Sequence, residues 1–171
     1  MPIRPIVKYG DKVLHAPARA VPEIDDSVRA LVADMVATMY AAPGIGLAAP
    51  QVGVPLRVIV IDLSVGADAK QLIRLVNPEI VEREGEQQHE EGCLSIPGYA
   101  GSPKRPARVL ARGLDLDGKP QLFEATELLA RAFCHEIDHI DGLLFVDRLT
   151  PLKRDLMKRK LRKRAREGWE E

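Results

Sequence analysis

The pentapeptide HEIDH, residues 135–139, constrains the fold of this 171-residue chain more than any other feature. Two histidines four positions apart lie on one face of an α-helix, a turn from each other, so their ring nitrogens can bind one metal ion. The carboxylate of Glu136 then lies at the edge of the same site, where it can move protons for a metal-bound water. The pentapeptide therefore predicts a helix, and it indicates a metal site that other parts of the chain must complete.

A catalytic metal usually has three protein ligands and one open position, so a third ligand is needed. Cys134 is adjacent to His135 but points about 100° around the helix from it, and cannot easily share the ion. Cys93 follows a glycine in EGCLS, residues 91–95, and is free of that constraint. A thiolate at Cys93 would complete a Cys/His/His set, with the carboxylates of Asp141 and Glu90 as competing third ligands.

The simpler interpretation is that both histidines are hydrogen-bonded core residues. A buried Glu136 would then be costly, because a buried charge needs a charge partner or an ion. Asp138 is either a plain polar helix residue or an anchor held by a basic neighbour, for which Arg105 is the candidate. The other two histidines, His15 and His89, are expected on the surface.

A glycine-rich segment, GIGLAAPQ at residues 44–51, is expected to form a loop without regular structure. Its pattern is superficially that of a dinucleotide fingerprint, but it follows a helical segment, and Pro50 prevents a helix from beginning there. A better interpretation is a loop whose backbone approaches a substrate, with the Gln51 side chain donating an amide hydrogen to a developing oxyanion. The alternative is a tight structural turn with a solvent-facing glutamine.

The remaining segments predict an α+β fold, with small antiparallel sheets packed around a central metal-binding HExxH helix. Helical periodicity and capping residues indicate helices over 25–40, 126–142 and 151–168. Asp25 or Asp26 is the expected N-cap of the first, Gly142 the left-handed end of the second, and Pro151 the first residue of the third. Strands are expected over 57–63 and over 71–82, the second with an interruption at Asn77-Pro78. Two more strands, over 107–115 and 121–125, are expected around a turn at 117–120. Residues 84–91 are expected to be extended.

Composition limits the class of protein. Hydrophobic residues make up 46% and charged residues 29%, which is typical of a soluble globular chain. No apolar run approaches the roughly 20 residues that span a bilayer. Two cysteines imply no disulfide framework, so a reducing, cytoplasmic location fits.

Charge is unevenly distributed, although the formal net charge is zero. From Pro151 onward nine Lys/Arg stand against four acidic residues, a net charge of +5, which leaves −5 for the rest of the chain. The chain is therefore expected to comprise a body, 1–149, and a basic C-terminal helix, 150–171, which is either part of the same domain or an arm.

Three ordered motifs, GIGLAAPQ, EGCLS and HEIDH, together resemble the peptide deformylases, which remove the formyl group from the N-terminal methionine of new bacterial or organellar polypeptides. The resemblance extends through essentially the whole chain, including NPEI at residues 77–80. It implies that residues 1–149 form the catalytic domain of a monomeric, metal-dependent hydrolase that releases formate from N-formyl-methionyl nascent peptides.

The resemblance also assigns roles, carried over onto matching positions. It implies metal ligands at Cys93, His135 and His139 and a catalytic carboxylate at Glu136. Oxyanion donors would be the Gln51 side chain and the Leu94 backbone N–H. Substrate would contact the backbone of Ile45, Gly46 and Gly92. The methionine pocket would include Ile45, Leu128, Ala132 and the apolar part of Arg131.

One position departs from the family pattern, because Cys134 stands where a glutamine usually precedes the first histidine. The family's ion in cells is typically ferrous iron, and Zn²⁺, Ni²⁺ or Co²⁺ can occupy the site. Some members bind the ribosome through the C-terminal helix. Residues 158–166 hold seven Lys/Arg in nine positions, which suits either contact with ribosomal RNA or a merely solvated helix face.

Two other classes remain open from the residues alone. One is a metallopeptidase, although the third ligand of zincins normally lies downstream of HExxH and Cys93 lies 42 positions upstream of His135. The other is a non-catalytic RNA-binding module whose metal is enclosed by four protein ligands.

Overall fold

The computed structural model describes residues 2–169 and shows an α+β fold, which confirms the expected fold class. Its helices are α1 (Asp26–Ala41), α2 (Glu127–Ile140) and α3 (Pro151–Glu167). Its strands are β1 (Gly46–Ala48), β2 (Val58–Ile61), β3 (Ile73–Glu84), β4 (Gln87–Gln88), β5 (Glu91–Gly92), β6 (Ala100–Gly101), β7 (Lys104–Arg105), β8 (Arg108–Leu114) and β9 (Pro120–Thr126). Short 3₁₀ turns cover Lys12–His15, Ala49–Val52, Ala69–Gln71 and Phe145–Arg148.

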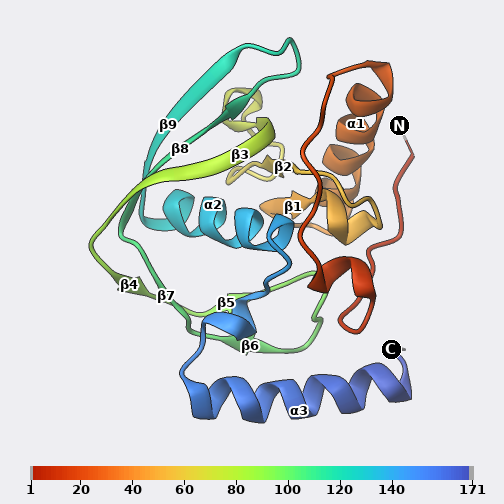
Figure 1. Ribbon diagram of the computed structural model, residues 1–171, viewed down its shortest axis with the longest axis vertical. Coiled ribbons are helices and arrows are strands. Elements are labelled where there is room, and N and C mark those ends of the chain that lie inside the picture. The colour runs from red at the N-terminus through yellow and green to blue at the C-terminus, as the bar shows by residue number, and fades with distance from the viewer. Residues whose placement is uncertain (1, 170–171) are drawn as a thin grey trace.

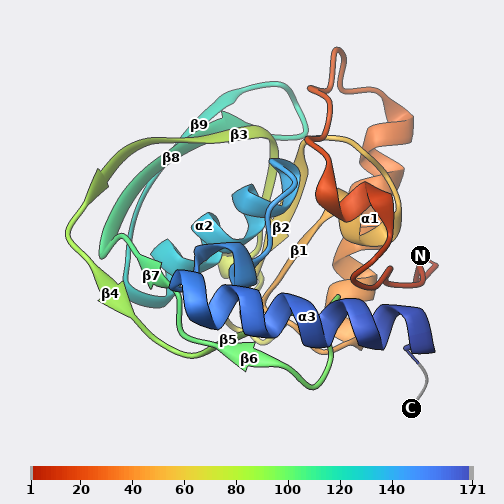
Figure 2. The same cartoon turned by 60° about the horizontal axis from the view of Figure 1, so that its bottom comes forward.

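The strands form one larger sheet and two small ladders around α2. The five-stranded antiparallel sheet has the order β1-β2-β3-β8-β9, and the ladders are β4-β7 and β5-β6. In Figure 1, α2 runs through the middle of the molecule, with β3, β8 and β9 above it and the ladders below. Figure 2 shows the sheet curving around α2, and Figure 1 shows α3 as a separate layer below the two ladders. The expectation of antiparallel strands packed around the histidine-bearing helix is confirmed.

β2 shows how the core is shared between two helices. Successive side chains of a strand point to opposite faces of the sheet. Ile59 and Ile61 pack in the same cluster as Phe133 of α2, whereas Val58 and Val60 pack in the cluster that contains the apolar side of α1. All four β2 residues are fully buried, which explains why this strand is a continuous apolar run rather than an alternating one.

The expectation that residues 44–51 lack regular structure is wrong. Gly46–Ala48 forms β1, which pairs antiparallel with β2 at the edge of the sheet. Leu47 and Ala48 are fully buried, so hydrophobic burial stabilises a strand that Gly46 disfavours. Pro50 is compatible with the short 3₁₀ turn, because it lies at the start of that turn. A backbone N–H at this position would have no partner within the turn, so its absence in proline costs nothing.

The expected interruption at Asn77-Pro78 is a bulge rather than a break. β3 continues through it to Glu84, and the register against β8 shifts between Val76 and Glu79. Asn77 adopts a left-handed backbone conformation with φ 51°, and its side chain bonds both the N–H and the C=O of Val21. The bulge therefore attaches the N-terminal segment to the sheet.

Helix boundaries follow the expected caps. The Asp25 side chain accepts a hydrogen bond from the Val28 N–H at the start of α1. Gly142 ends the α2 region with φ 81°, where a Cβ would lie 2.8 Å from the backbone of Ala16. α3 begins at Pro151, directly after Thr150. Local sequence signals predicted these boundaries because caps depend on only a few neighbouring residues.

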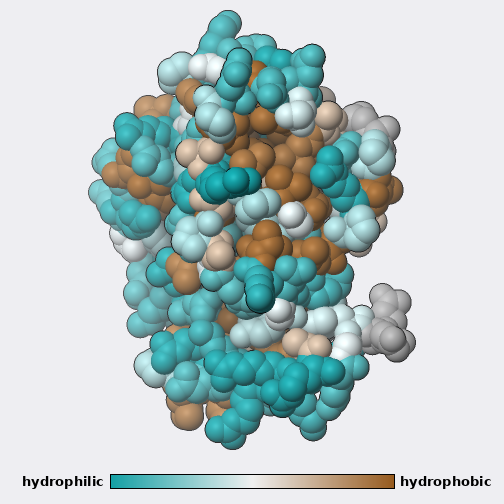
Figure 3. Space-filling model, turned by 45° about the vertical axis from the view of Figure 1, so that its right-hand side comes forward, coloured by the Kyte–Doolittle hydropathy of each residue, from teal (hydrophilic) through white to brown (hydrophobic). Residues whose placement is uncertain are grey.

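α3 packs on the body through a narrow apolar side. Leu161 is fully buried in a cluster with Tyr9, Ile96 and Phe145. The outer side of α3 is polar, and the lower part of the molecule in Figure 3 is accordingly mostly hydrophilic. Among residues 2–169, no helix combines the length and the apolar character that crossing a bilayer requires.

Candidate metal centre

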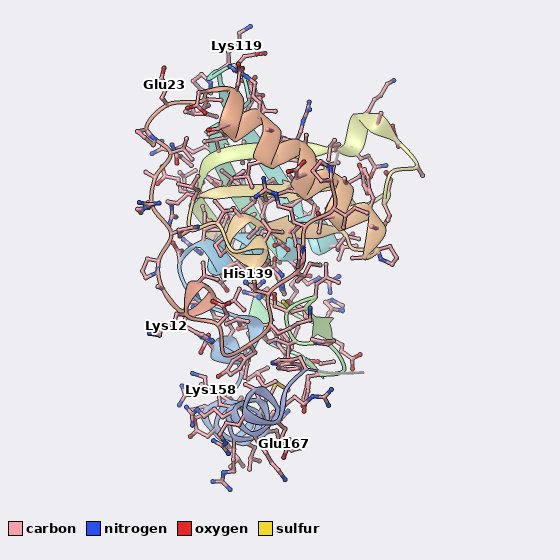
Figure 4. The ribbon with its side chains drawn as sticks, turned by 90° about the vertical axis from the view of Figure 1, so that its right-hand side faces the viewer. Lys12, Glu23, Lys119, His139, Lys158 and Glu167 are labelled. Atoms are coloured by element: carbon pink, nitrogen blue, oxygen red, sulfur yellow. The ribbon has the colours of Figure 1, made fainter. Side chains whose placement is uncertain are left out.

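Three side chains from two parts of the chain converge inside the fold. α2 supplies His135 and His139, and the loop that follows β5 supplies Cys93. His139 Nε2 lies 3.2 Å from His135 Nε2 and 3.4 Å from Cys93 Sγ, and the three possible ligand atoms all lie within 4.8 Å of one another. Figure 4 shows His139 in the interior, between the sheet and the α3 layer that carries Lys158 and Glu167.

These separations suit a four-coordinate metal ion. With metal–nitrogen bonds of about 2.0 Å and a metal–sulfur bond of about 2.3 Å, tetrahedral geometry separates two nitrogens by about 3.3 Å and a nitrogen from a sulfur by about 3.5 Å. Burial, together with His135, lowers the pKa of His139 well below its usual value and keeps this imidazole in the neutral form that binds metal. The buried Nδ1 of His139 has no hydrogen-bond partner among the described residues. The donor set therefore fits a divalent transition metal better than a pair of hydrogen-bonded core histidines.

The competing third ligands lie elsewhere. Cys134 is buried beside the site but outside the cluster of possible ligand atoms, and burial raises the pKa of its thiol to about 11. Asp141 forms an ion pair with Arg57 at 2.9 Å. Glu90 is exposed. Among residues 2–169, the cluster contains three possible ligands, which suits a centre with an open position.

Glu91, which sequence reasoning did not single out, orients His135. Its Oε1 lies 3.0 Å from His135 Nδ1, which leaves Nε2 of that ring to face the cluster. Burial opposes ionisation of Glu91, but hydrogen bonds from His135 and Arg105 lower its pKa to about 2. A carboxylate that holds the far nitrogen of a ligand histidine fixes both the tautomer and the ring orientation.

Arg105 joins Glu91 to Asp138. Its guanidinium donates two hydrogen bonds of 3.0 Å to Glu91 and one of 2.6 Å to Asp138, and its side chain is 3% exposed. The hypothesis that Arg105 is the basic neighbour of Asp138 is thus confirmed by the ion pair. Arg148 also binds Asp138, with contacts of 2.9 and 3.1 Å. The result is a charge network directly behind the histidines, in which Arg105, Glu91 and Asp138 are nearly buried and Arg148 is half-exposed.

Glu136 is buried at the edge of the cluster. Burial raises its pKa to about 7, and its Oε1 has no hydrogen-bond partner among the described residues. Gly46 of β1 permits this placement, because a Cβ at position 46 would lie 2.5 Å from Glu136 Oε2. The arrangement leaves a carboxyl group that is able to exchange a proton near neutral pH next to the candidate ligands.

Gln51 is buried rather than solvent-facing, with 2% of its surface exposed. The Ala48 N–H donates to its Oε1 at 3.0 Å, so its amide nitrogen must point the other way. That nitrogen lies 3.2 Å from Ser95 Oγ and 3.6 Å from Cys93 Sγ. The amide hydrogens of Gln51 are therefore directed at the side of the centre that carries the thiol.

A cavity of about 500 Å³ opens beside the candidate ligands. Leu128, in the first turn of α2, is 39% exposed, whereas most residues of this helix from Ala130 onward are buried. The lining includes the residues predicted to bind substrate: Ile45, Gly46, Gly92, Leu128, Ala132 and Arg131, together with Cys93, Leu94, His135 and Glu136. Sequence reasoning missed other lining residues: Pro43, Gly44, Glu91, Ile96, Gly98 and Tyr99. His15 and His89 are exposed, as expected.

Comparison with known proteins shows which family this chain and its fold are similar to. A sequence model of the family described as polypeptide deformylase matches residues 3–155. A peptide deformylase of Acidobacterium capsulatum is 52% identical over 168 residues, covering 98% of this chain and 99% of the relative. The crystal structure of a peptide deformylase from Legionella pneumophila superposes with a TM-score of 0.87 at 48% identity, covering 94% of each chain. A structure of the Ehrlichia chaffeensis peptide deformylase in complex with actinonin gives a TM-score of 0.85 at 38% identity, covering 95% of this chain and 98% of that one.

Proposed function

This chain belongs to the polypeptide deformylase family, and from that premise we propose that Cys93, His135 and His139 hold its catalytic metal ion. It is a metal-dependent hydrolase that removes the N-formyl group from newly made polypeptides. The observation that supports the ligand assignment most strongly is the convergence of one thiol and two imidazoles beside a buried carboxyl group at a cavity. A divalent ion held by these residues would supply Lewis acidity for the hydrolysis.

Glu136 is the proton carrier in this proposal. It takes a proton from the water that attacks the formyl carbon and later gives a proton to the leaving amine nitrogen, so that formate and a free methionyl amine result. A pKa of about 7 suits both transfers, because such a group gains and loses a proton with similar ease near neutral pH. Gly46 supports the role by allowing the carboxyl group to lie against the backbone of β1.

The oxyanion of the tetrahedral intermediate is bound by the Gln51 amide and the Leu94 backbone N–H. Gln51 is suited to this role because its oxygen is already held by Ala48, which directs its amide nitrogen toward Cys93. A donor whose orientation is fixed before the reaction stabilises developing charge without reorganisation. Leu94 lies next to Cys93 in the chain and lines the same cavity.

The substrate peptide lies extended beside β1 and β5. β1 is an edge strand, so one side of its backbone is available for pairing, and the backbone of Ile45, Gly46 and Gly92 makes these contacts. The methionine side chain lies against Leu128, Ala132 and the apolar stem of Arg131, together with Ile45. In this proposal selectivity is strong at methionine and weak beyond it, and acyl groups longer than formyl are excluded by steric contact with the apolar cavity wall.

The test of this function is formate release from formyl-Met-Ala-Ser by the iron-loaded protein, measured with a coupled formate assay. Free-amine Met-Ala-Ser serves as the comparison, because a metallopeptidase would cleave an internal bond of that peptide. Formate release from the first substrate and no cleavage of the second is the expected result. Cleavage of the second without formate from the first would show a metallopeptidase. Absence of turnover with four protein ligands on the metal would show a structural site.

Ferrous iron is the native ion in this proposal, with zinc, nickel and cobalt as possible replacements. We expect the iron form to lose activity in air within hours, whereas the nickel form retains it, because oxidation of the ferrous centre also damages its thiolate ligand Cys93. The measurement is formate release over time after exposure to air, with an anaerobic sample as control. Equal air stability of the two forms would contradict an iron–thiolate site.

The basic helix α3 is proposed to place the enzyme at the ribosome through contact with ribosomal RNA. One surface of α3 is lined by Lys158, Arg159, Arg162 and Arg166, with Asp155 as its acidic member. In this proposal the C-terminal segment extends the 1–149 catalytic domain, and α3 packs on that domain through Leu161. The enzyme acts as a monomer in the cytoplasm, where formylated nascent chains emerge.

Reversing three of these charges tests the ribosome proposal. The triple variant Arg159→Glu, Arg162→Glu and Arg166→Glu should lose most of the ribosome affinity of the wild type, and the salt dependence of the residual affinity should be shallower. Co-sedimentation with ribosomes at several salt concentrations measures both. A variant with three reversals elsewhere, at Lys70, Arg83 and Lys119, carries the same net charge; Figure 4 shows Lys119 at the end of the molecule opposite α3. Equal affinity of the two variants would contradict a role of α3.

A further inference from the structure

Tyr99 lines the cavity from the loop that also carries Cys93. This loop connects β5 to β6, and Gly92 pairs with Ala100 across that ladder. The Tyr99 N–H donates to the Ile96 C=O at 3.3 Å. The backbone of Tyr99 is therefore fixed relative to Cys93, while the direction of its ring depends on what packs against it.

Trp169, just beyond the end of α3, packs against that ring. The two ring centroids lie 6.1 Å apart with their planes at 78°, an edge-to-face arrangement. The indole is itself held in place: its Nε1 donates to the Tyr9 C=O at 2.9 Å, and the Arg164 guanidinium lies 5.5 Å from its centroid. Figures 1 and 2 both show the β5–β6 segment running alongside α3. Elements from both ends of the chain thus support one side chain of the cavity wall.

We propose that Tyr99 is a specificity-determining residue that contacts the substrate beyond its formyl-methionine, and that Trp169 is the positioning residue that holds the Tyr99 ring in the cavity wall. The inference deepens the proposed function and rests on it. The formyl group must lie at Cys93, His135 and Glu136, and the methionine side chain against α2. Tyr99 belongs to neither group of residues, so the part of the peptide that it can contact is the part that follows methionine.

An aromatic side chain in the cavity wall suits a contact with the residues after methionine, which differ from one substrate to the next. A tyrosine ring offers a large, mostly apolar surface at little cost in conformational entropy, and it packs against peptide groups as well as side chains. Without Trp169, the Tyr99 ring could rotate away from the cavity wall. The two residues should therefore act as one unit. Their effects on long substrates should therefore not add.

The experiment compares formyl-Met-amide with formyl-Met-Ala-Ser as substrates of the iron-loaded full-length enzyme. Tyr99→Ala should lower kcat/KM for the long substrate about fivefold to tenfold, mainly by raising KM, and should change the short substrate less than about twofold. Trp169→Ala should show the same pattern, and the double variant should be no worse than Tyr99→Ala alone. Tyr99→Phe should behave like wild type, because the packing needs the ring and not the hydroxyl. Leu152→Ala, which removes an apolar side chain from the exposed start of α3, should leave both substrates unaffected.

Contrary outcomes separate this inference from the proposed function. Formate release by the wild type with unchanged long-substrate kinetics in Tyr99→Ala overturns the inference alone. Equal losses on both substrates also overturn it, since they indicate damage to the centre. Additive losses in the double variant overturn the role of Trp169. No formate from either substrate with the wild type would instead reject the proposed function. If Trp169→Ala does not fold, Trp169→Leu, which keeps apolar volume but removes the ring edge, must give the same pattern.

Discussion

Replacing Glu136 with glutamine is expected to lower kcat for formate release about a thousandfold, within the usual range for loss of a positioned general acid–base group. Glutamine has nearly the shape of glutamate but cannot accept a proton from water. Among the described residues the buried Oε1 of Glu136 has no hydrogen-bond partner, so the fold should tolerate the exchange. Single-turnover and steady-state formate assays on the metal-loaded variant measure the effect.

The interpretation depends on an intact centre, so metal content and thermal unfolding are measured on the same preparation. Metal stoichiometry should equal that of the wild type, because Glu136 is not among the three candidate ligands. Glu82→Gln, an exposed carboxylate on β3, provides the matched control and should retain full activity. A kcat within tenfold of wild type for Glu136→Gln would exclude Glu136 as the proton carrier.

Replacing Arg105 with methionine is expected to lower the free energy of unfolding by about 3–5 kcal/mol, the range for breaking a buried ion pair from one side. The change leaves Glu91, whose side chain is 9% exposed, without its bidentate partner, and leaves Asp138 dependent on Arg148. Activity should also fall, because Glu91 then no longer has a fixed position from which to orient His135. Chemical denaturation and formate assays measure the two effects.

Two variants sharpen the Arg105 experiment. Arg105→Lys keeps the charge but cannot bind both carboxylates with a planar fork, so it should still lose stability and activity. Arg108→Met removes the same kind of side chain, but its ion pairs with Glu84 and Glu124 involve exposed carboxylates, so it should cost much less stability than Arg105→Met. An Arg105→Met variant no less stable than Arg108→Met, or an Arg105→Lys variant indistinguishable from wild type, would contradict a supporting role for the network.

Glu90 and Glu91 illustrate a limit of sequence reasoning. The two residues are chemically identical and adjacent, and Glu90 was the one considered as a ligand. Because side chains of extended backbone alternate between faces, a shift of one position exchanges the inward and outward residue. Glu91 points at His135 and Arg105, whereas Glu90 is exposed. No local pattern distinguishes the two, since the register is set by the pairing of β5 with β6.

Residues 46–48 show the same limit for the prediction of backbone structure from sequence. The glycine content of this segment predicted a loop, but burial of Leu47 and Ala48 against the rest of the core makes it a strand. The reason for glycine at position 46 is the carboxyl group of Glu136, which lies 90 positions away along the chain. Only the folded arrangement brings the two residues together.

By itself the sequence determined the features that depend on near neighbours or on periodicity: the helix that displays His135 and His139, the caps of the helices, the apolar strand β2 and the charge of α3. It also predicted which residues could form the centre, and the structure brings three of them, Cys93, His135 and His139, into one cluster of possible ligands. Tertiary structure alone decided that Glu91 orients His135, that Gly46 makes room for Glu136, and that Trp169 supports the wall of the cavity. These are contacts between distant segments, and their geometry depends on how sheets and helices pack, which no local pattern of residues encodes.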